Sequence, residues 1–322
     1  MSEIKKLKIG FIGTGGFARK VHYPSLARIE QAEIVAICGR TRMERVNEVA
    51  DQYCIKNRYL DYQKMLEETD IDAVFAIMRP TQGLTQIACD ILNAGKHLFI
   101  EKPPAINVEE MKIMVEAAQK SGCYTMVGFN RRHIPILIEA KKLVKEQGLC
   151  SIVATFYKNE MKNDWTEGSK LLSNGIHAVD SLRWMAESEV KEIVAAKSKA
   201  FTDHDNAWYA LIRFENDVIG TLLTNYSVGV RANTFELHGK AISAFVDLDK
   251  SAVIYIRGKD KTVTTLNAKE FAGSDEFIEY YGFHPQAKHF VDCILTGKKP
   301  MPDFADSLKS MDLVERIEKG GM

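Results

Sequence analysis

Short apolar runs alternate with segments of helical periodicity over the first 125 or so residues of the chain. Apolar runs bounded by turn residues indicate buried strands, and polar N-cap residues indicate helix starts. Asn107 fits such a start, Thr41–Glu44 fits a capping box, and Asn93–Gly95 fits a helix stop. Strands that alternate with helices predict βαβ units, and hence a doubly wound parallel sheet of the α/β class. The expected strands are Lys8–Ile12, Glu33–Cys38, Asp72–Ile77, His97–Ile100 and Tyr124–Val127, with a weaker one near Arg58–Tyr59.

The pattern changes after about residue 150, where apolar runs follow one another with only turns between them. Several runs alternate apolar and polar residues, which is typical of an antiparallel sheet with one covered face. Glu215–Asp217 fits a hairpin turn between two of them. The runs are Ser151–Tyr157, Ile193–Lys197, Trp208–Phe214, Val218–Tyr226, Thr234–His238 and Ala252–Arg257, and helices are expected near Gly175–Ala186, Pro285–Thr296 and Asp306–Glu318. We therefore predict an α/β domain over residues 1–125 and an α+β domain, built on a mostly antiparallel open sheet, over residues 126–322.

Length, charge and cysteine usage restrict the class of protein. A chain of 322 residues suits two domains, and 46% hydrophobic residues are enough for a sizeable core. The 43 basic and 43 acidic side chains cancel, which argues against nucleic acid or an anionic membrane as a partner. No apolar stretch reaches the roughly 18 residues of a membrane span, and Met1–Lys6 lacks the apolar core of a signal peptide. Six cysteines without a C-x-x-C pair indicate reduced thiols, so we expect a cytoplasmic protein.

A glycine-rich turn follows the first expected strand directly. Gly13 lets the chain turn tightly, Gly15 has no Cβ to hold a pyrophosphate away, and Ala18 lets the next helix lie close to the strand. The N–H groups at the start of that helix then face the phosphates. A purely structural turn is the alternative, but the position after a buried N-terminal strand favours dinucleotide binding. The predicted cofactor-binding residues of this turn are Gly13, Thr14, Gly15, Gly16, Phe17 and Ala18.

The end of the second expected strand bears on which nicotinamide cofactor is bound. An NAD-preferring site usually carries Asp or Glu here, to bind the ribose hydroxyl groups. Gly39 leaves room instead, and Arg40 and Arg42 can pair with a 2′-phosphate; Thr41 between them belongs to the same predicted site. A solvated helix start is the alternative, although the positive end of a helix dipole disfavours cations there. NADP is therefore the expected cofactor, with NAD as the alternative.

A charged pair followed by two prolines ends the strand His97–Ile100. Pro103 biases Lys102 toward an extended backbone and blocks continuation into a helix. The carboxyl ends of strands in an open α/β sheet line the ligand crevice, so Lys102 is expected where a nicotinamide ring lies. A solvated Glu101–Lys102 pair is the commoner fate of such a sequence, but the double proline and the strand-end position favour a function. Lysine suits proton transfer because its pKa falls readily on burial or near positive charge.

Later in the chain, three residues are spaced as on one face of a helix: His177, Asp180 and Trp184. His177 and Asp180 share a helix face, and a histidine beside a carboxylate can exchange protons because its unperturbed pKa is near ~6.5. A core histidine that is satisfied by Asp180 is the alternative for this segment.

Other polar residues are weaker candidates. Asn130, Arg131 and Arg132 follow the last expected strand of the first domain and face either the substrate or a salt bridge at the domain junction. The aromatic residues Trp165 and Tyr281 suit a sugar pocket, although ordinary packing is the better expectation for such residues. No metal site is expected, because three adjacent residues such as those at positions 203–205 cannot all face one ion.

These segments together resemble the Gfo/Idh/MocA family of NAD(P)-dependent sugar and cyclitol oxidoreductases. The resemblance covers essentially the whole chain, and its most specific part is Ala94–His97 leading into Glu101–Pro103. It implies an N-terminal Rossmann domain in which Pro80, Glu101 and Lys102 belong to the cofactor site. It also implies that Lys102 and His177 are the catalytic pair and converge on one substrate. The second domain is then expected to carry the substrate contacts and the interface of a homodimer or homotetramer. The segments that carry the resemblance are the glycine turn, Ala94–Pro103, Val127–Arg132 and Gly175–His177 with Asp180.

The chain departs from the family pattern near the expected chemistry. Ser173 takes the position of an aspartate four residues before His177, Glu167–Ser169 replaces a glycine-rich run, and Leu84 replaces a second histidine. Loss of the aspartate removes an orienting partner or proton relay for His177, while Ser173 remains a candidate substrate contact. The departures leave Lys102 and His177 in place.

Three functions follow from these observations. The main hypothesis is an NADP-dependent oxidoreductase that acts on a carbinol or carbonyl of a sugar, cyclitol or related small polar molecule. A cofactor-binding sensor without turnover is the alternative from another class, and Ser173 favours it. An NAD-assisted glycoside hydrolase, which borrows and returns the hydride, is the third.

Overall fold

The structure is a computed structural model that describes residues 6–162, 168–257 and 262–321. The chain forms two compact units, of which the first comprises Met1–Gly128 and Phe283–Leu308 and the second comprises Phe129–Gly282 and Lys309–Met322. The domain boundary near residue 125 stays a prediction. No helix in the described part of the chain is long and apolar enough to cross a membrane.

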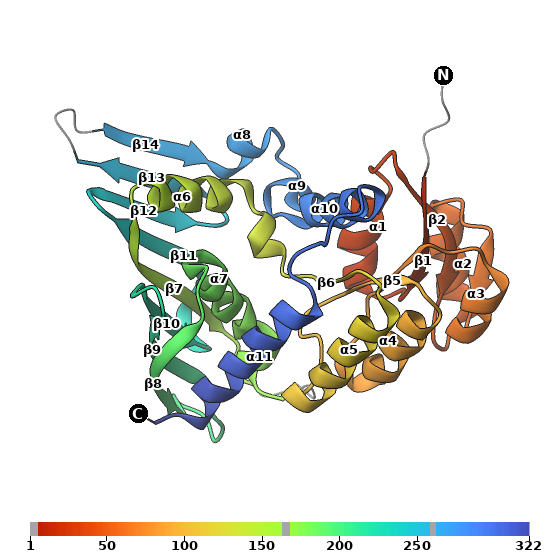
Figure 1. The fold of residues 1–322 in the computed structure, drawn as a ribbon, viewed down its shortest axis with the longest axis horizontal. Helices are drawn as coiled ribbons and strands as arrows, with labels where there is room; N and C mark the ends of the chain where they lie inside the picture. Colours follow the sequence, from red (N-terminus) through yellow and green to blue (C-terminus); the bar gives the residue numbers. More distant parts are fainter. Residues whose placement is uncertain (1–5, 163–167, 258–261, 322) are drawn as a thin grey trace. The chain divides into compact units, whose positions relative to one another are not determined.

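The first unit is built on a six-stranded sheet in which every neighbouring pair is parallel. Its strand order, β3-β2-β1-β4-β5-β6, is that of a Rossmann fold, which confirms the predicted doubly wound sheet (Figure 1). The weaker strand expected near Arg58–Tyr59 forms the edge of this sheet. The strands are β1 (Leu7–Ile12), β2 (Ala32–Cys38), β3 (Asn57–Tyr59), β4 (Ala73–Ala76), β5 (His97–Ile100) and β6 (Thr125–Val127).

The helices of the first unit begin and end largely where local signals place them. The side chain of Asn107 accepts a hydrogen bond from Glu110 N at 2.8 Å and caps α5, as expected. Gly95, with φ +74°, follows the end of α4 and confirms the helix stop. The capping box at Thr41–Glu44 is wrong, because Arg42 holds the N-cap position of α2 and its side chain makes no capping bond. These elements are η1 (Ala18–His22), α1 (Tyr23–Leu26), α2 (Met43–Gln52), α3 (Tyr62–Glu68), η2 (Pro80–Gln82), α4 (Leu84–Asn93), α5 (Val108–Ser121) and α10 (Phe283–Leu295).

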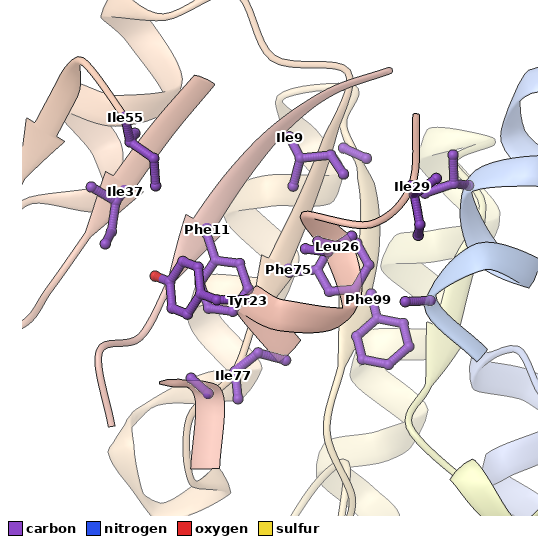
Figure 2. Packing of buried hydrophobic residues seen from close by; sticks show 14 of the residues in the cluster. Ile9, Phe11, Tyr23, Leu26, Ile29, Ile37, Ile55, Phe75, Ile77 and Phe99 are labelled. Atoms are coloured by element: carbon purple, nitrogen blue, oxygen red, sulfur yellow. The ribbon is translucent and has the colours of Figure 1, made fainter. Parts of the chain in front are cut away.

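An aromatic stack forms the centre of the first unit's core (Figure 2). Phe11 stacks on Tyr23 with ring centroids 3.9 Å apart, and Phe75 stacks on Phe99 at 4.5 Å. Phe290 of α10 meets Phe75 edge-on at 5.4 Å. Each fully buried ring stabilises the fold by about 2 kcal/mol. Helix α10 was expected in the second domain, but its apolar face completes the core of the first unit.

The second unit is built on an eight-stranded sheet in the order β14-β13-β12-β11-β7-β10-β9-β8. Among the described strands of this sheet, only β7 and β10 pair in parallel, which confirms the mostly antiparallel sheet. The hairpin turn is also confirmed, because Asp217 N donates to Phe214 O at 3.0 Å between β9 and β10. Strands β12 and β14 were not expected. The strands are β7 (Leu149–Asn159), β8 (Val190–Ser198), β9 (Ala207–Phe214), β10 (Ile219–Asn225), β11 (Ser227–Gly239), β12 (Ile242–Asp247), β13 (Ser251–Ile256) and β14 (Thr262–Asn267).

Two helices cover one face of this sheet. Helix α6 contacts β11, β12 and β13, and α7 contacts β7 and β10 (Figure 1). The strands therefore alternate buried and exposed residues, as the sequence pattern indicated. The remaining elements of this unit are η3 (Asn130–His133), α6 (Pro135–Glu146), η4 (Leu171–Gly175), α7 (Ile176–Ala186), α8 (Ala268–Ala272), α9 (Phe277–Tyr280) and most of α11 (Phe304–Lys319).

Candidate active site

The glycine turn after β1 has the geometry that a dinucleotide needs. Gly13 has φ +122°, and a Cβ there would lie 2.3 Å from Ile77 O, so this position excludes other residues. A Cβ on Gly15 or Gly16 would meet nothing within 4 Å, which leaves open space over this part of the turn. Arg19 N donates to Gly15 O at 3.0 Å, which is the first hydrogen bond of the helix. The N–H groups that precede Arg19 in this first turn therefore have no carbonyl of the helix as acceptor. The residues present therefore fit a pyrophosphate.

Two substitutions separate the structural role of this turn from its binding role. Gly13→Ala is expected to destabilise the protein by about 2 kcal/mol or more, because a positive φ and a backbone oxygen both oppose the new Cβ. Gly15→Ala should leave stability within about 0.5 kcal/mol but weaken dinucleotide binding, because its Cβ enters open space only. Urea denaturation and fluorescence titration with NADPH measure the two effects. Unchanged NADPH affinity in Gly15→Ala would contradict binding at this turn.

The predicted phosphate-selecting residues follow β2. Packing restricts the position of Gly39, since a Cβ there would lie 2.5 Å from Val46 Cγ2. Arg40, Thr41 and Arg42 are exposed, and neither arginine forms an ion pair with any described residue. Two guanidinium groups at the end of β2 are thus available to an anion.

Lys102 lies in a turn that is held by a buried contact. The carboxylate of Glu101 is buried, with Oε1 2.9 Å from His22 Nε2 and Oε2 accepting from Lys102 N at 3.2 Å. A Cβ on Gly128 would lie 2.6 Å from Glu101 Oε1, so a glycine is needed beside this carboxylate. The Lys102–Pro103 peptide is cis. Glu101 therefore anchors the turn that carries Lys102, and its contact with the cofactor stays a prediction.

The topology brings the predicted residues of the first unit to one edge of the sheet. Gly13 follows β1, Arg40 follows β2, and Lys102 follows β5, while the buried Pro80 opens η2 after β4. Strands β2, β1, β4 and β5 are adjacent and parallel, so their carboxyl ends meet at the same edge. A ligand crevice in such a sheet lies at that edge.

His177 is the second residue of α7 in the second unit. Its ring meets that of Phe129 edge-on, with centroids 6.1 Å apart. Ser173 is fully buried in η4, four residues earlier, and its N donates to Ser169 O at 2.9 Å. His177 and Ser173 are thus held by the same short helical segment.

Asp180 is not the hydrogen-bond partner of His177. Its fully buried carboxylate accepts from Arg132 Nε at 2.8 Å, from Arg132 Nη2 at 2.6 Å and from Ser310 Oγ at 2.9 Å. The interpretation of His177 as a core histidine satisfied by Asp180 is therefore wrong. Arg132 does form a salt bridge, but the pair joins η3, α7 and α11 within the second unit and not at a domain junction.

Asn130 and Tyr281 come together although they are far apart in the sequence. Asn130 Nδ2 donates to Tyr281 O at 2.8 Å, and the Tyr281 ring stacks on Phe277 with centroids 4.8 Å apart. A Cβ on Gly282 would lie 2.4 Å from Asn130 O, so the two segments approach closely. These contacts fix both residues, and their contacts with substrate stay predictions. Trp165 lies outside the described residues.

The polar loop before β9 makes local ion pairs. His204 Nδ1 lies 2.9 Å from Asp203 Oδ1, and Asp205 Oδ2 lies 2.8 Å from Lys197 Nζ. Across the described ranges, no three His, Cys, Asp or Glu side chains gather as metal ligands.

The sequence did not predict two polar contacts, one in each unit. His22 lies one helical turn beyond Ala18, and Lys158 at the end of β7 contacts Asn174 of η4. The position of His22 on the helix after the glycine turn could have indicated its role in this site. No local sequence pattern indicates that Lys158 pairs with Asn174.

A six-stranded parallel sheet with a glycine turn at its carboxyl edge is the architecture of Rossmann dinucleotide-binding domains. A family model described as "Oxidoreductase family, NAD-binding Rossmann fold" matches residues 7–129. A second model, "GFO/IDH/MocA C-terminal domain", matches residues 140–245. The chain belongs to the Gfo/Idh/MocA family.

Relatives with known names support the same class. The chain is 32% identical to the uncharacterized oxidoreductase YrbE of Bacillus subtilis over 59% of its length and 57% of that protein. It is 26% identical to 4-carboxy-2-hydroxymuconate-6-semialdehyde dehydrogenase of a Sphingobium species, over 97% of this chain and 98% of that one. A solved structure of levoglucosan dehydrogenase in complex with NADH and L-sorbose shares the fold, with a TM-score of 0.82 at 22% identity, covering 98% of this chain and 96% of that one.

Proposed function

We propose that this chain is an NADP-dependent oxidoreductase that acts on a carbinol or carbonyl of a sugar, cyclitol or related small polar molecule. The observation that carries the proposal is the position of Lys102 at the same sheet edge as the glycine turn. The bound nicotinamide supplies the hydride-transfer chemistry. Levoglucosan dehydrogenase, whose structure holds NADH and L-sorbose, supports a sugar-like substrate.

Lys102 and His177 have separate roles in this proposal. The Lys102 ammonium donates a hydrogen bond to the reacting oxygen of the substrate, and the buried Glu101 holds the backbone turn that positions it. His177 exchanges the proton of that oxygen, which suits an imidazole because its unperturbed pKa is near ~6.5. Pro80, Thr14 and Phe17 complete the proposed cofactor site, and Ser173, Asn130 and Tyr281 the proposed substrate site.

A polyol and sugar panel with NADP⁺ or NAD⁺ tests the reaction. Net reduction of the nicotinamide, followed by absorbance, is the expected result. Dinucleotide binding without turnover on any substrate would instead support the sensor. The presence of Ser173 at the position of the family's aspartate favours that alternative. Release of a sugar from a glycoside without net reduction would support the NAD-assisted hydrolase.

The choice of NADP is tested at the end of β2. The double variant Arg40→Ala, Arg42→Ala is expected to weaken NADPH binding at least about tenfold, because it removes charge-assisted bonds to the 2′-phosphate. Its affinity for NADH should change less than about twofold. Fluorescence titration with both cofactors checks this, with Arg45→Ala on α2, the helix that follows, as a matched control. A wild-type protein that prefers NADH would overturn the choice.

Assembly and location complete the proposal. The face of the second unit's sheet that α6 and α7 leave uncovered carries exposed Val194, Leu211, Phe245 and Tyr255. Apolar side chains of this size on one sheet face support a homodimer or homotetramer. The six cysteines are free thiols, which supports a cytoplasmic location.

A further inference from the structure

Two buried cations and one half-buried cation lie in the second unit beside the segment that carries His177. We name Arg131, Lys158 and Lys170 the basic cluster. Arg131 is 5% exposed and Lys170 is 2% exposed, while the side chain of Lys158 is 16% exposed. The Arg131 guanidinium lies 5.1 Å from the centroid of the Phe156 ring, and Lys158 Nζ lies 5.4 Å from the same centroid. The ring thus brings two of the cations together.

Among the residues that the structure describes, one carboxylate forms ion pairs with the basic cluster. Glu160 lies 3.2 Å from Lys158 Nζ and 3.8 Å from Lys170 Nζ, and it is the carboxylate that both lysines share. Arg131 forms no ion pair with any described residue, and its Nη2 donates to the neutral Asn233 Oδ1 at 3.0 Å. Burial lowers the pKa of Arg131 and of Lys158, and their mutual repulsion lowers the pKa of Lys158 further. Buried charge of this kind is normally paired.

Two buried donors in the same place lack an acceptor. Lys158 Nζ donates to Asn174 Oδ1 at 3.1 Å, and because an ammonium can only donate, this bond fixes which end of the amide faces Lys158. Asn174 Nδ2 therefore points away from Lys158, and it is buried without a hydrogen-bond partner among the described residues. Arg131 Nη1 is also buried without an acceptor of its own there, although the Tyr281 hydroxyl group hydrogen-bonds the same guanidinium group. Asn174 is 8% exposed and precedes His177 by three residues.

We propose that the substrate carries an oxyanion, a carboxylate or a phosphate, which Lys158, Asn174 and Arg131 bind close to His177. The inference rests on the proposed function and narrows its substrate class from neutral polyols to sugar acids, hydroxy acids or sugar phosphates. An oxyanion supplies several acceptor oxygens, which match the fork of Arg131 and the amide donor of Asn174. It also supplies the negative charge that the basic cluster lacks, whereas a neutral hydroxyl group supplies neither.

Anion binding tests this inference without turnover. Malonate and inorganic phosphate are titrated at constant ionic strength into the full-length protein, and binding is measured by calorimetry and by the shift in Tm. Lys158→Gln is expected to weaken binding of the preferred anion at least about tenfold. Lys191→Gln, an exposed lysine on β8, is the matched control and should bind as the wild type does. Stronger binding of malonate or of phosphate identifies the oxyanion.

A second variant keeps the test valid if Lys158→Gln folds poorly. Asn174→Asp places a carboxylate 3.1 Å from Lys158 and thereby supplies the missing charge within the chain. It is expected to raise Tm and to abolish the effect of added anion. Equal anion binding by the wild type and both variants, or no binding by the wild type, would overturn the inference.

Turnover separates this inference from the proposed function. D-Glucuronate and D-glucose 6-phosphate are compared with D-glucose, and at least a tenfold higher kcat/KM for a charged member, lost in Lys158→Gln, supports both. Turnover that prefers the neutral sugar in wild type and variant alike overturns the inference alone. Anion binding that depends on Lys158, with no redox turnover on any compound, retains the oxyanion site and overturns the oxidoreductase.

Discussion

Replacing Lys102 with methionine is expected to lower kcat/KM by about 10³-fold while the Kd for NADPH changes less than about threefold. The size follows from the typical contribution of one preorganised hydrogen-bond donor at the reacting oxygen, ~10²–10³-fold. Cofactor affinity should persist because the glycine turn after β1, rather than the turn after β5, cradles the phosphates. Steady-state kinetics and fluorescence titration on the same preparation measure the two quantities.

Two further variants show whether the loss is chemical. Lys102→Arg keeps the positive charge but replaces a compact ammonium group with a larger planar guanidinium group, which cannot donate from the same position, so it should remain almost as slow as the methionine variant. Lys64→Met removes an exposed lysine from α3 in the same unit and should retain full activity. Normal turnover by Lys102→Met would refute the role of Lys102, whatever the variant's affinity for cofactor.

The fold was largely predictable because its signals are local. The first unit's strands are short apolar runs ended by glycine, proline or helix caps, and each such signal acts within a few residues. Strand β12 was missed because it follows β11 across a tight turn at Lys240–Ala241 with no polar interval to mark it. The capping box failed for a different reason: the helix begins one residue later than the pattern implies, with Arg42 in the place of an acceptor.

The site was predictable only where a motif carries it. Lys102 and His177 stand out because strand-end lysine and helical histidine occur within recognisable segments. The partners of Asp180 could not be found in this way, because Arg132 is 48 residues away and Ser310 is 130 residues away. Helical spacing places Asp180 beside His177. A buried carboxylate, however, pairs with the strongest hydrogen-bond donor near it, and a bidentate guanidinium group is a stronger donor than an imidazole. Lys158 and Asn174 were missed for the same reason, because their contact joins residues that no local sequence pattern connects.

Replacing Asp180 with alanine is expected to destabilise the second unit by about 3–5 kcal/mol. The substitution leaves the buried Arg132 guanidinium without its carboxylate, and an uncompensated buried charge costs that much. Asp180→Asn should cost less, because an amide oxygen still accepts one of the two guanidinium bonds. Urea denaturation followed by far-UV circular dichroism measures the change in the free energy of unfolding.

A double variant and an exposed pair test the physical reason. Arg132→Met combined with Asp180→Leu should recover most of the stability lost in Asp180→Ala, since it removes both charges and restores apolar volume. Asp312→Ala breaks the exposed pair with Arg316 on α11, 3.9 Å apart, and should cost less than about 1 kcal/mol. If Asp180→Ala cost no more than Asp312→Ala, Arg132 would have to find another anion or water, and the pair would not hold η3, α7 and α11 together. Because His177 lies on α7 three residues before Asp180, loss of Asp180 should also slow turnover in the fraction that folds.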